Sequence, residues 1–96
     1  MGRRGFVYIM ASGRNGTLYV GVTSDLVKRA YEHKAGLGAG FTSRYGCTNL
    51  VWFEVHDRIE DAIRREKQIK AWRRAWKMRV IEEMNPGWED LFASLT

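Results

Sequence analysis

Two short runs near the start of the chain have the hydrophobic pattern of β-strands. They cover residues 6–10 and 17–22 and are rich in aromatic and β-branched residues, which favour strands. Asn15-Gly16 lies between them and is a strong signal for a hairpin turn. A third run, Leu50–Val55, is largely apolar without alternation, as is typical of a central or well-covered strand. The pattern therefore predicts a hairpin and one further strand.

Each strand of the predicted hairpin carries a tyrosine. The period of two places Tyr19 and Gly21 on the same face of the second strand. Depending on the register, Tyr8 of the first strand can face Tyr19 across the antiparallel pair. Gly21 has no side chain, so we expect a space beside Tyr19 that can admit a backbone or a ligand.

The hairpin is followed by a predicted helix. Thr23 or Ser24 can cap it, and it is expected to run to about Ala35, before a glycine. Arg29 and His33 are four residues apart and therefore project together from this helix. The pair is either part of a site or a solvated basic pair on an amphipathic helix.

Residues 36–49 are rich in glycine and are predicted to form a loop. The loop carries Phe41, Arg44 and Tyr45. Aromatic and cationic side chains among glycines suit contact with a nucleic-acid backbone or base. The alternative is an ordinary connection with Phe41 in the core.

A long helix is predicted to begin at residues 57–58 and to run to about Trp76, where it can bend into a further helix that ends near Met84. Glu66 lies on its apolar stripe, where an unpaired carboxylate is strongly unfavourable. The carboxylate therefore needs a cation, a metal ion or water in a cleft. A structural salt bridge, for instance to Arg29, is the alternative.

The end of the chain is predicted to be a stop followed by a closing helix. Residues 85–87, Asn-Pro-Gly, are expected to end the long helix, and residues 88–95 to form a short one. Trp72 and Trp76 fall on the apolar stripe of the long helix, so we assign both to the core rather than to base stacking.

Charge favours an anionic partner. The formal net charge is +5, and residues 58–79 hold nine basic residues against three acidic ones, which is +6 in one helical segment. Such a surface suits a phosphate backbone, although a solvated basic face is the common alternative. Arg65 and Arg73 belong to this segment.

Length and cysteine content narrow the class of protein to which the chain can belong. A length of 96 residues predicts one domain over residues 1–96. Cys47 is the only cysteine, which excludes a disulfide framework within the chain, and we expect it to be half-buried. No stretch approaches the roughly 18 apolar residues of a membrane span. We expect a cytoplasmic protein without a membrane partner.

The residues just described resemble the GIY-YIG nuclease superfamily, in particular its small single-domain bacterial members. The two halves of the family name correspond to residues 6–8, Phe-Val-Tyr, and 19–21, Tyr-Val-Gly. Phe6 replaces the first glycine, but that position contributes backbone. The family's helix arginine falls on Arg29, and the histidine of many members falls on His33. Its metal-binding glutamate falls on Glu66.

The resemblance implies an α+β fold with a small three-stranded antiparallel sheet flanked by helices. It also implies an endonuclease that hydrolyses phosphodiester bonds with one Mg²⁺ or Mn²⁺ ion held by Glu66. Arg29 would grip the scissile phosphate, Tyr8 or Tyr19 would accept the proton of water, and His33 would relay it. The substrate-binding residues would be Arg29, Arg44, Arg65, Arg73 and Asn85.

The expected partner is nucleic acid, with DNA first, in repair or recombination. Two alternatives belong to other classes: a non-catalytic nucleic-acid-binding module with the same fold, and a protein-interaction domain. The sequence leaves open which tyrosine is the general base and what the oligomeric state is.

Overall fold

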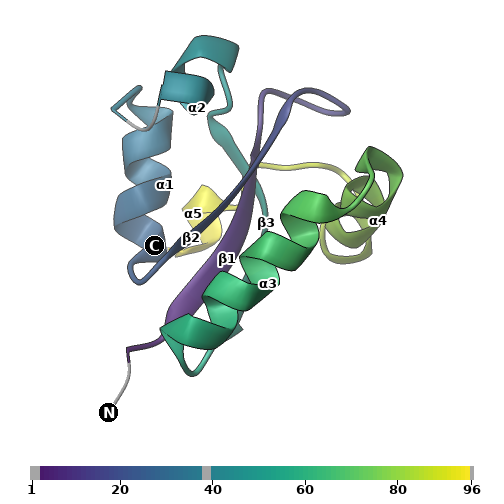
Figure 1. Ribbon diagram of the computed structural model, residues 1–96. Helices are drawn as coiled ribbons and strands as arrows, with labels where there is room; N and C mark the ends of the chain where they lie inside the picture. The colour runs from purple at the N-terminus through teal and green to yellow at the C-terminus, as the bar shows by residue number, and fades with distance from the viewer. Residues whose placement is uncertain (1–2, 38–39, 96) are drawn as a thin grey trace.

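The computed structural model describes residues 3–37 and 40–95, and within them three strands form one antiparallel sheet (Figure 1). The strands are β1 (Gly5–Ala11), β2 (Leu18–Thr23) and β3 (Asn49–His56), in the order β2-β1-β3. The predicted hairpin and the α+β class are thereby confirmed. β1 rather than the third run is the central strand, and the apolar start of β3 is buried by the helices that cover it.

Helices cover both faces of the sheet. Side chains of α3 (Ile59–Ala71) and α4 (Arg74–Met84) pack with one set of strand residues, including Val7 and Ile9. Side chains of α1 (Leu26–Lys34) and the segment around α5 (Phe92–Leu95) pack with the alternate set, including Tyr8 and Met10. The period-two alternation of β1 thus feeds two separate cores. Among the described residues, no helix is long and apolar enough to cross a membrane.

The register of the hairpin places the two tyrosines diagonally. Tyr8 lies opposite Gly21, and Met10 lies opposite Tyr19. The space above Gly21 is filled by Tyr8 itself, because a Cβ atom at position 21 would lie 2.4 Å from the Tyr8 hydroxyl oxygen. The space that we expected beside Tyr19 therefore admits a side chain of the protein rather than a ligand.

Two predictions about the segments around α1 are wrong. The N-cap of α1 is Asp25, whose carboxylate accepts a hydrogen bond from the Lys28 N–H, while Thr23 accepts one from the Asp25 N–H. The predicted loop at 36–49 contains a short helix, α2 (Gly40–Tyr45); residues 38–39 of that loop lie outside the described part. Helix α2 forms because Thr42 is anchored in the interior, as described below.

The long helix breaks earlier than predicted, at Trp72–Arg73, where both residues are extended. The break lets Trp72 pack against the core, while Arg74 donates hydrogen bonds to the Asn15 and Gly16 carbonyls in the hairpin turn. Trp76, assigned to the core from the sequence, is exposed beyond this break.

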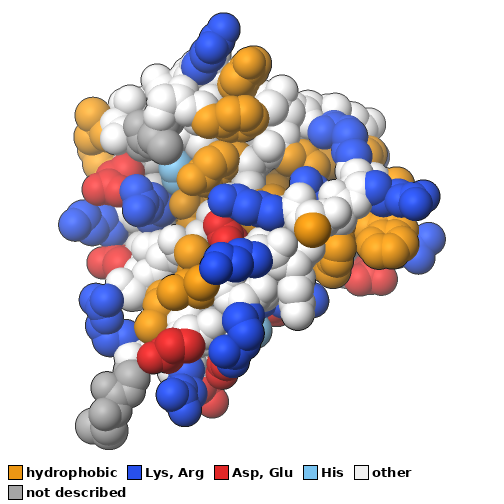
Figure 2. Space-filling model, in the orientation of Figure 1, with side chains coloured by type: hydrophobic (Ala, Val, Ile, Leu, Met, Phe, Trp, Pro, Cys, Tyr) orange, Lys and Arg blue, Asp and Glu red, His pale blue; other side chains and the backbone are white. Residues whose placement is uncertain are grey.

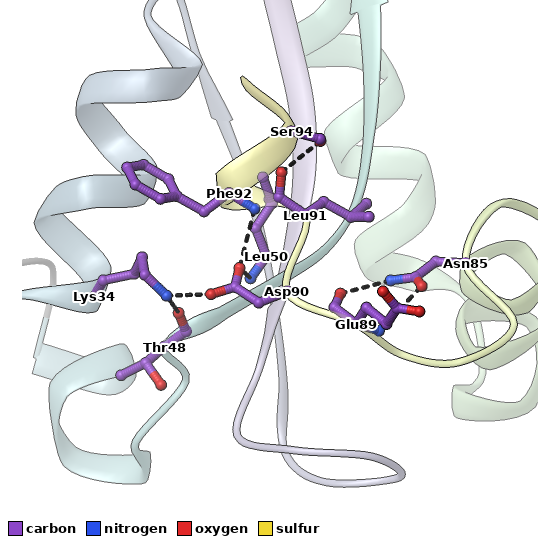
Figure 3. Close-up of polar contacts among 9 residues, drawn as sticks. All are labelled: Lys34, Thr48, Leu50, Asn85, Glu89, Asp90, Leu91, Phe92 and Ser94. Carbon is purple, nitrogen blue, oxygen red and sulfur yellow. Dashed lines mark hydrogen bonds and ion pairs between the residues drawn. The ribbon is translucent and has the colours of Figure 1, made fainter. Parts of the chain in front are cut away.

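The last segment of the chain is tied down by two polar side chains (Figure 3). The Asn85 amide donates to the Val51 carbonyl at 3.1 Å and to the Glu89 carbonyl at 2.8 Å, and its oxygen accepts from the Glu89 N–H at 3.0 Å. These bonds hold an irregular turn, and the expected closing helix is reduced to α5.

Asp90 forms a clamp that joins the end of the chain to both α1 and β3 (Figure 3). Its carboxylate accepts from the backbone N–H groups of Leu50 and Phe92, each at 3.1 Å, and pairs with the Lys34 ammonium. Burial alone would raise the pKa of Asp90, but these donors and the Lys34 charge outweigh it and hold the pKa below its ordinary value of 3.8.

Asp90→Asn is expected to lower the free energy of unfolding at pH 7 by about 1–2 kcal/mol, because charge-assisted hydrogen bonds are lost. The folded-state pKa lies below the unfolded one, so this stabilisation is fully present above pH ~4 and is lost as the pH falls through the folded-state pKa. Urea unfolding at pH 7 and near pH 2–3 should show the difference between the two proteins shrinking in acid.

The matched control is Asp61→Asn, which removes an exposed ion pair with Arg64 and should change stability by less than about 1 kcal/mol. An Asp90→Asn penalty that is equally large in acid would mean that the clamp acts through shape and not through charge.

Candidate active site

A buried chain of polar groups runs from β1 through α1 to α2. The Tyr8 hydroxyl and His33 Nε2 share a hydrogen bond of 2.9 Å, and His33 Nδ1 shares another of 2.9 Å with Thr42 Oγ1. All three side chains are buried. A neutral imidazole has one donor and one acceptor nitrogen, so the two bonds together fix the orientation of the ring, with one hydroxyl donating to it and the other accepting from it.

Both titratable members of this chain are held neutral. Burial, reinforced by the neighbouring Tyr19, raises the pKa of Tyr8 far above its ordinary value of 10, although Arg29 opposes the shift. Burial, reinforced by the Arg29 charge, lowers the pKa of His33. At pH 7 the buried polar groups therefore include a neutral Tyr8 phenol and a neutral His33 imidazole.

Tyr19 and Arg29 lie at the more exposed end of this cluster. The Tyr19 ring centroid is 6.4 Å from that of Tyr8 and 5.4 Å from that of His33, and the side chain is only half-buried. Arg29 is half-exposed one turn before His33 and makes a loose ion pair of 3.7 Å with Glu32. Four of the predicted catalytic residues are thus brought together.

Glu66 approaches from the other layer of the fold. Helix α3 covers the opposite face of the sheet from α1, but β2 is the edge strand and lies between α1 and α3 (Figure 1). After burial and the neighbouring Tyr19, the Glu66 charge is a smaller cause of the raised pKa of Tyr8.

The Glu66 side chain is 11% exposed and pairs with Lys70 at 2.8 Å, and Lys70 is 52% exposed. The partner is therefore a neighbouring lysine on the same helix, and the Arg29 salt bridge that we considered as an alternative is replaced by the pair with Glu32.

The donor set around Glu66 suits one kind of metal ion. Among residues 3–37 and 40–95, no group of three or more His, Cys, Asp or Glu side chains could hold a metal. Mg²⁺ is commonly bound by one or two carboxylates plus substrate phosphates while it keeps several waters. A single nearly buried carboxylate fits such an ion and does not fit a structural zinc site.

The residues predicted to bind substrate lie in different parts of the fold. Arg65 pairs with Glu54 of β3 at 3.0 Å, and Arg73 stacks over Trp76 beyond the helix break. Arg44 lies at the exposed end of α2. Asn85 is buried in the C-terminal turn, where both amide hydrogens are committed, so we remove it from the substrate-binding set.

Thr42 is the buried polar contact that sequence reasoning missed. It lies in the segment predicted to be a loop, and a threonine between Phe41 and Ser43 gives no periodic signal there. Only the packing of α2 against α1 brings it to His33.

The fold and the site together define a class: an α+β domain in which a hairpin carries two neighbouring tyrosines and two helices supply an arginine and a nearly buried glutamate. The family model of the GIY-YIG catalytic domain matches residues 4–79. The chain belongs to the GIY-YIG nuclease family, and the resemblance drawn from the sequence is confirmed.

Relatives of this chain include UPF0213 proteins of staphylococci. One from Staphylococcus aureus strain Mu50 is 36% identical over 78 residues, which cover 81% of this chain and 94% of that protein. One from Staphylococcus saprophyticus is 35% identical with the same coverage. The solution NMR structure of a UPF0213 protein from Bacillus halodurans has a TM-score of 0.56 and 29% identity, and the match covers 91% of this chain and 92% of that one.

Proposed function

We propose that this protein is a metal-dependent endonuclease that hydrolyses phosphodiester bonds in DNA. The observation that carries the proposal is the polar chain of Tyr8, His33 and Thr42 behind the more exposed Tyr19 and Arg29. Membership of a nuclease family supports the reaction class. A buried, fully bonded support behind exposed groups is how an active site fixes its geometry before substrate arrives.

Arg29 is the group that we assign to the scissile phosphate. Its planar guanidinium can bind two phosphate oxygens at once. The 3.7 Å pair with Glu32 is loose and half-exposed, so little is lost when a phosphate takes its place.

Tyr19 is the tyrosine that we assign to the attacking water. Tyr8 is buried, and its raised pKa leaves almost none of it as the phenolate, the only form that could accept a proton. Tyr19 is accessible from solvent, and Arg29 or the bound metal ion would stabilise the Tyr19 phenolate that takes the proton of water. In this assignment Tyr8 and His33 act as positioning residues that hold the Tyr19 ring and the end of α1.

Glu66 would hold one Mg²⁺ or Mn²⁺ ion. When bound, the ion supplies a positive charge that stabilises the charge developing on the phosphate. Lys70, now paired with Glu66, would be released toward solvent.

The cellular context is also part of the proposal. We place the protein in the cytoplasm, with a role in DNA repair or recombination.

Cys47 is fully buried, and not half-buried as expected, and burial raises the pKa of its thiol. A buried neutral thiol behaves as a small apolar side chain.

The test is an assay with linear, nicked, flapped and four-way DNA in the presence of Mg²⁺ or Mn²⁺ and, in parallel, with chelator. Metal-dependent cleavage supports the endonuclease. Binding that falls steeply with salt but is never followed by cleavage indicates the non-catalytic module. A protein that neither binds nor cleaves nucleic acid would be an interaction domain, and the proposal would fail.

A further inference from the structure

A row of aromatic side chains leads outward from the candidate active site along α2. The Tyr19 and Phe41 ring centroids are 5.8 Å apart, and those of Phe41 and Tyr45 are 4.8 Å apart. The Arg44 guanidinium lies 5.6 Å from the Tyr45 ring centroid. Figure 2 shows a line of hydrophobic side chains that runs down the surface from α2 towards a histidine.

Helix α2 buries a polar side chain and exposes aromatic ones, which is the opposite of an ordinary surface helix. Its buried residue is the polar Thr42, which bonds to His33. Its two large aromatic side chains face solvent instead, with Phe41 44% exposed and Tyr45 47% exposed. Burying such rings is normally favourable, so their outward position indicates a surface that another molecule covers.

The chemistry of the row selects an unpaired nucleotide as its occupant. Bases stack on exposed aromatic rings whatever their sequence, and a nearby cation contacts the phosphate. Arg44 supplies that cation, and α2 contains no acidic residue. The row is also continuous with Tyr19, the tyrosine that we assign to the attacking water.

A paired duplex cannot use this surface in the same way. The bases of a duplex are stacked on each other, and placing one on a protein ring requires unstacking it. A single-stranded segment has free base faces and a flexible backbone.

We propose that Tyr19, Phe41 and Tyr45 form a stacking row for unpaired nucleotides adjacent to the bond that is cut. The preferred substrate is therefore DNA with a single-stranded segment next to the cleavage site. This inference deepens the proposed function and rests on it for the cleavage preference, whereas the binding surface itself does not depend on catalysis.

The binding test uses fluorescence anisotropy with a labelled single strand and a labelled duplex of equal length, in chelator so that nothing is cleaved. Phe41→Ala and Tyr45→Ala should each weaken single-strand binding about tenfold, because stacking on one ring contributes roughly that much per base. Duplex affinity should change less than about twofold. Phe41→Leu keeps the apolar bulk but not the ring face, and it should resemble Phe41→Ala.

The matched control is Tyr31→Ala, which removes an exposed tyrosine of α1 outside the row and should leave both affinities unchanged. Thermal unfolding of each variant shows whether α2 remains in place. In the metal-dependent assay, Phe41→Ala and Tyr45→Ala should lose the preference for flapped over linear DNA.

The outcomes separate the two proposals. If Phe41→Ala and Tyr45→Ala selectively lose single-strand binding but the wild type cleaves no DNA, the stacking row is supported and the proposed nuclease activity is wrong. Cleavage by the wild type with single-strand affinity unchanged in folded Phe41→Leu and Tyr45→Ala overturns the row. Equal weakening of duplex and single strand also overturns it, because the row would then be a general backbone contact.

Discussion

Glu66→Ala is expected to abolish metal-dependent cleavage while the protein stays folded. A bound divalent ion is worth several kcal/mol of transition-state stabilisation, so losing the carboxylate assigned to hold it should lower the rate about a thousandfold or more. Added Mg²⁺ should not restore activity. Affinity for DNA should persist or rise slightly, because a negative charge leaves a site that meets phosphate.

Stability distinguishes this role from a structural one. The partner of Glu66 is Lys70, which is half-exposed, so in the variant the lysine side chain is solvated by water. The free energy of unfolding should therefore change by at most about 1 kcal/mol. A buried pair would lose roughly 3–5 kcal/mol instead. Glu60→Ala, an exposed carboxylate of the same helix, is the matched control and should retain full activity.

Normal cleavage by the Glu66 variant would remove the carboxylate from the mechanism. Inactivity that is accompanied by unfolding would show that Glu66 is structural.

Tyr19→Phe is expected mainly to slow cleavage, whereas Tyr8→Phe is expected mainly to lower the stability of the fold. Removing a group that takes a proton in the transition state costs about 10²–10⁴ in rate, so Tyr19→Phe should lose at least about a hundredfold in turnover with little change in stability. Tyr8→Phe removes one partner of a buried hydrogen bond and strands His33 Nε2, which should cost about 1–3 kcal/mol of stability. Its rate should fall by a smaller factor, about tenfold.

Single-turnover cleavage and thermal unfolding of both variants measure the two effects, and Tyr31→Phe on the outer surface of α1 provides the control. The reverse pattern, with Tyr8→Phe stable but a hundredfold slower, would assign the proton transfer to the buried tyrosine.

Local patterns in the sequence were sufficient to predict much of the fold. The two runs on either side of Asn15-Gly16 formed the predicted hairpin, because turn chemistry and strand periodicity agree there. Glu66 was singled out because a carboxylate on an apolar stripe needs a partner, and the structure supplies Lys70. The diagonal placement of Tyr8 and Tyr19 depends on register, which two short alternating runs do not fix on their own.

The unpredicted features depend on contacts between distant segments. Helix α2 is six residues long and lacks an apolar stripe, so nothing in its sequence separates it from a loop. Its order follows from Thr42 binding a histidine nine residues away. The early end of α3 is similar, because Trp72 packs in the core while Arg74 reaches a turn at the other end of the chain.

The Asp90 clamp lies beyond the region that the family model matches. The family match ends at residue 79, yet Asp90 holds Lys34, the immediate neighbour of His33 in α1. A chain shortened to the matched region would keep every residue assigned to chemistry and lose the brace at the end of the helix that carries the imidazole. The C-terminal segment therefore supports the helix that carries part of the candidate site, and a variant trimmed to the matched region is expected to hold that helix less firmly than the whole chain does.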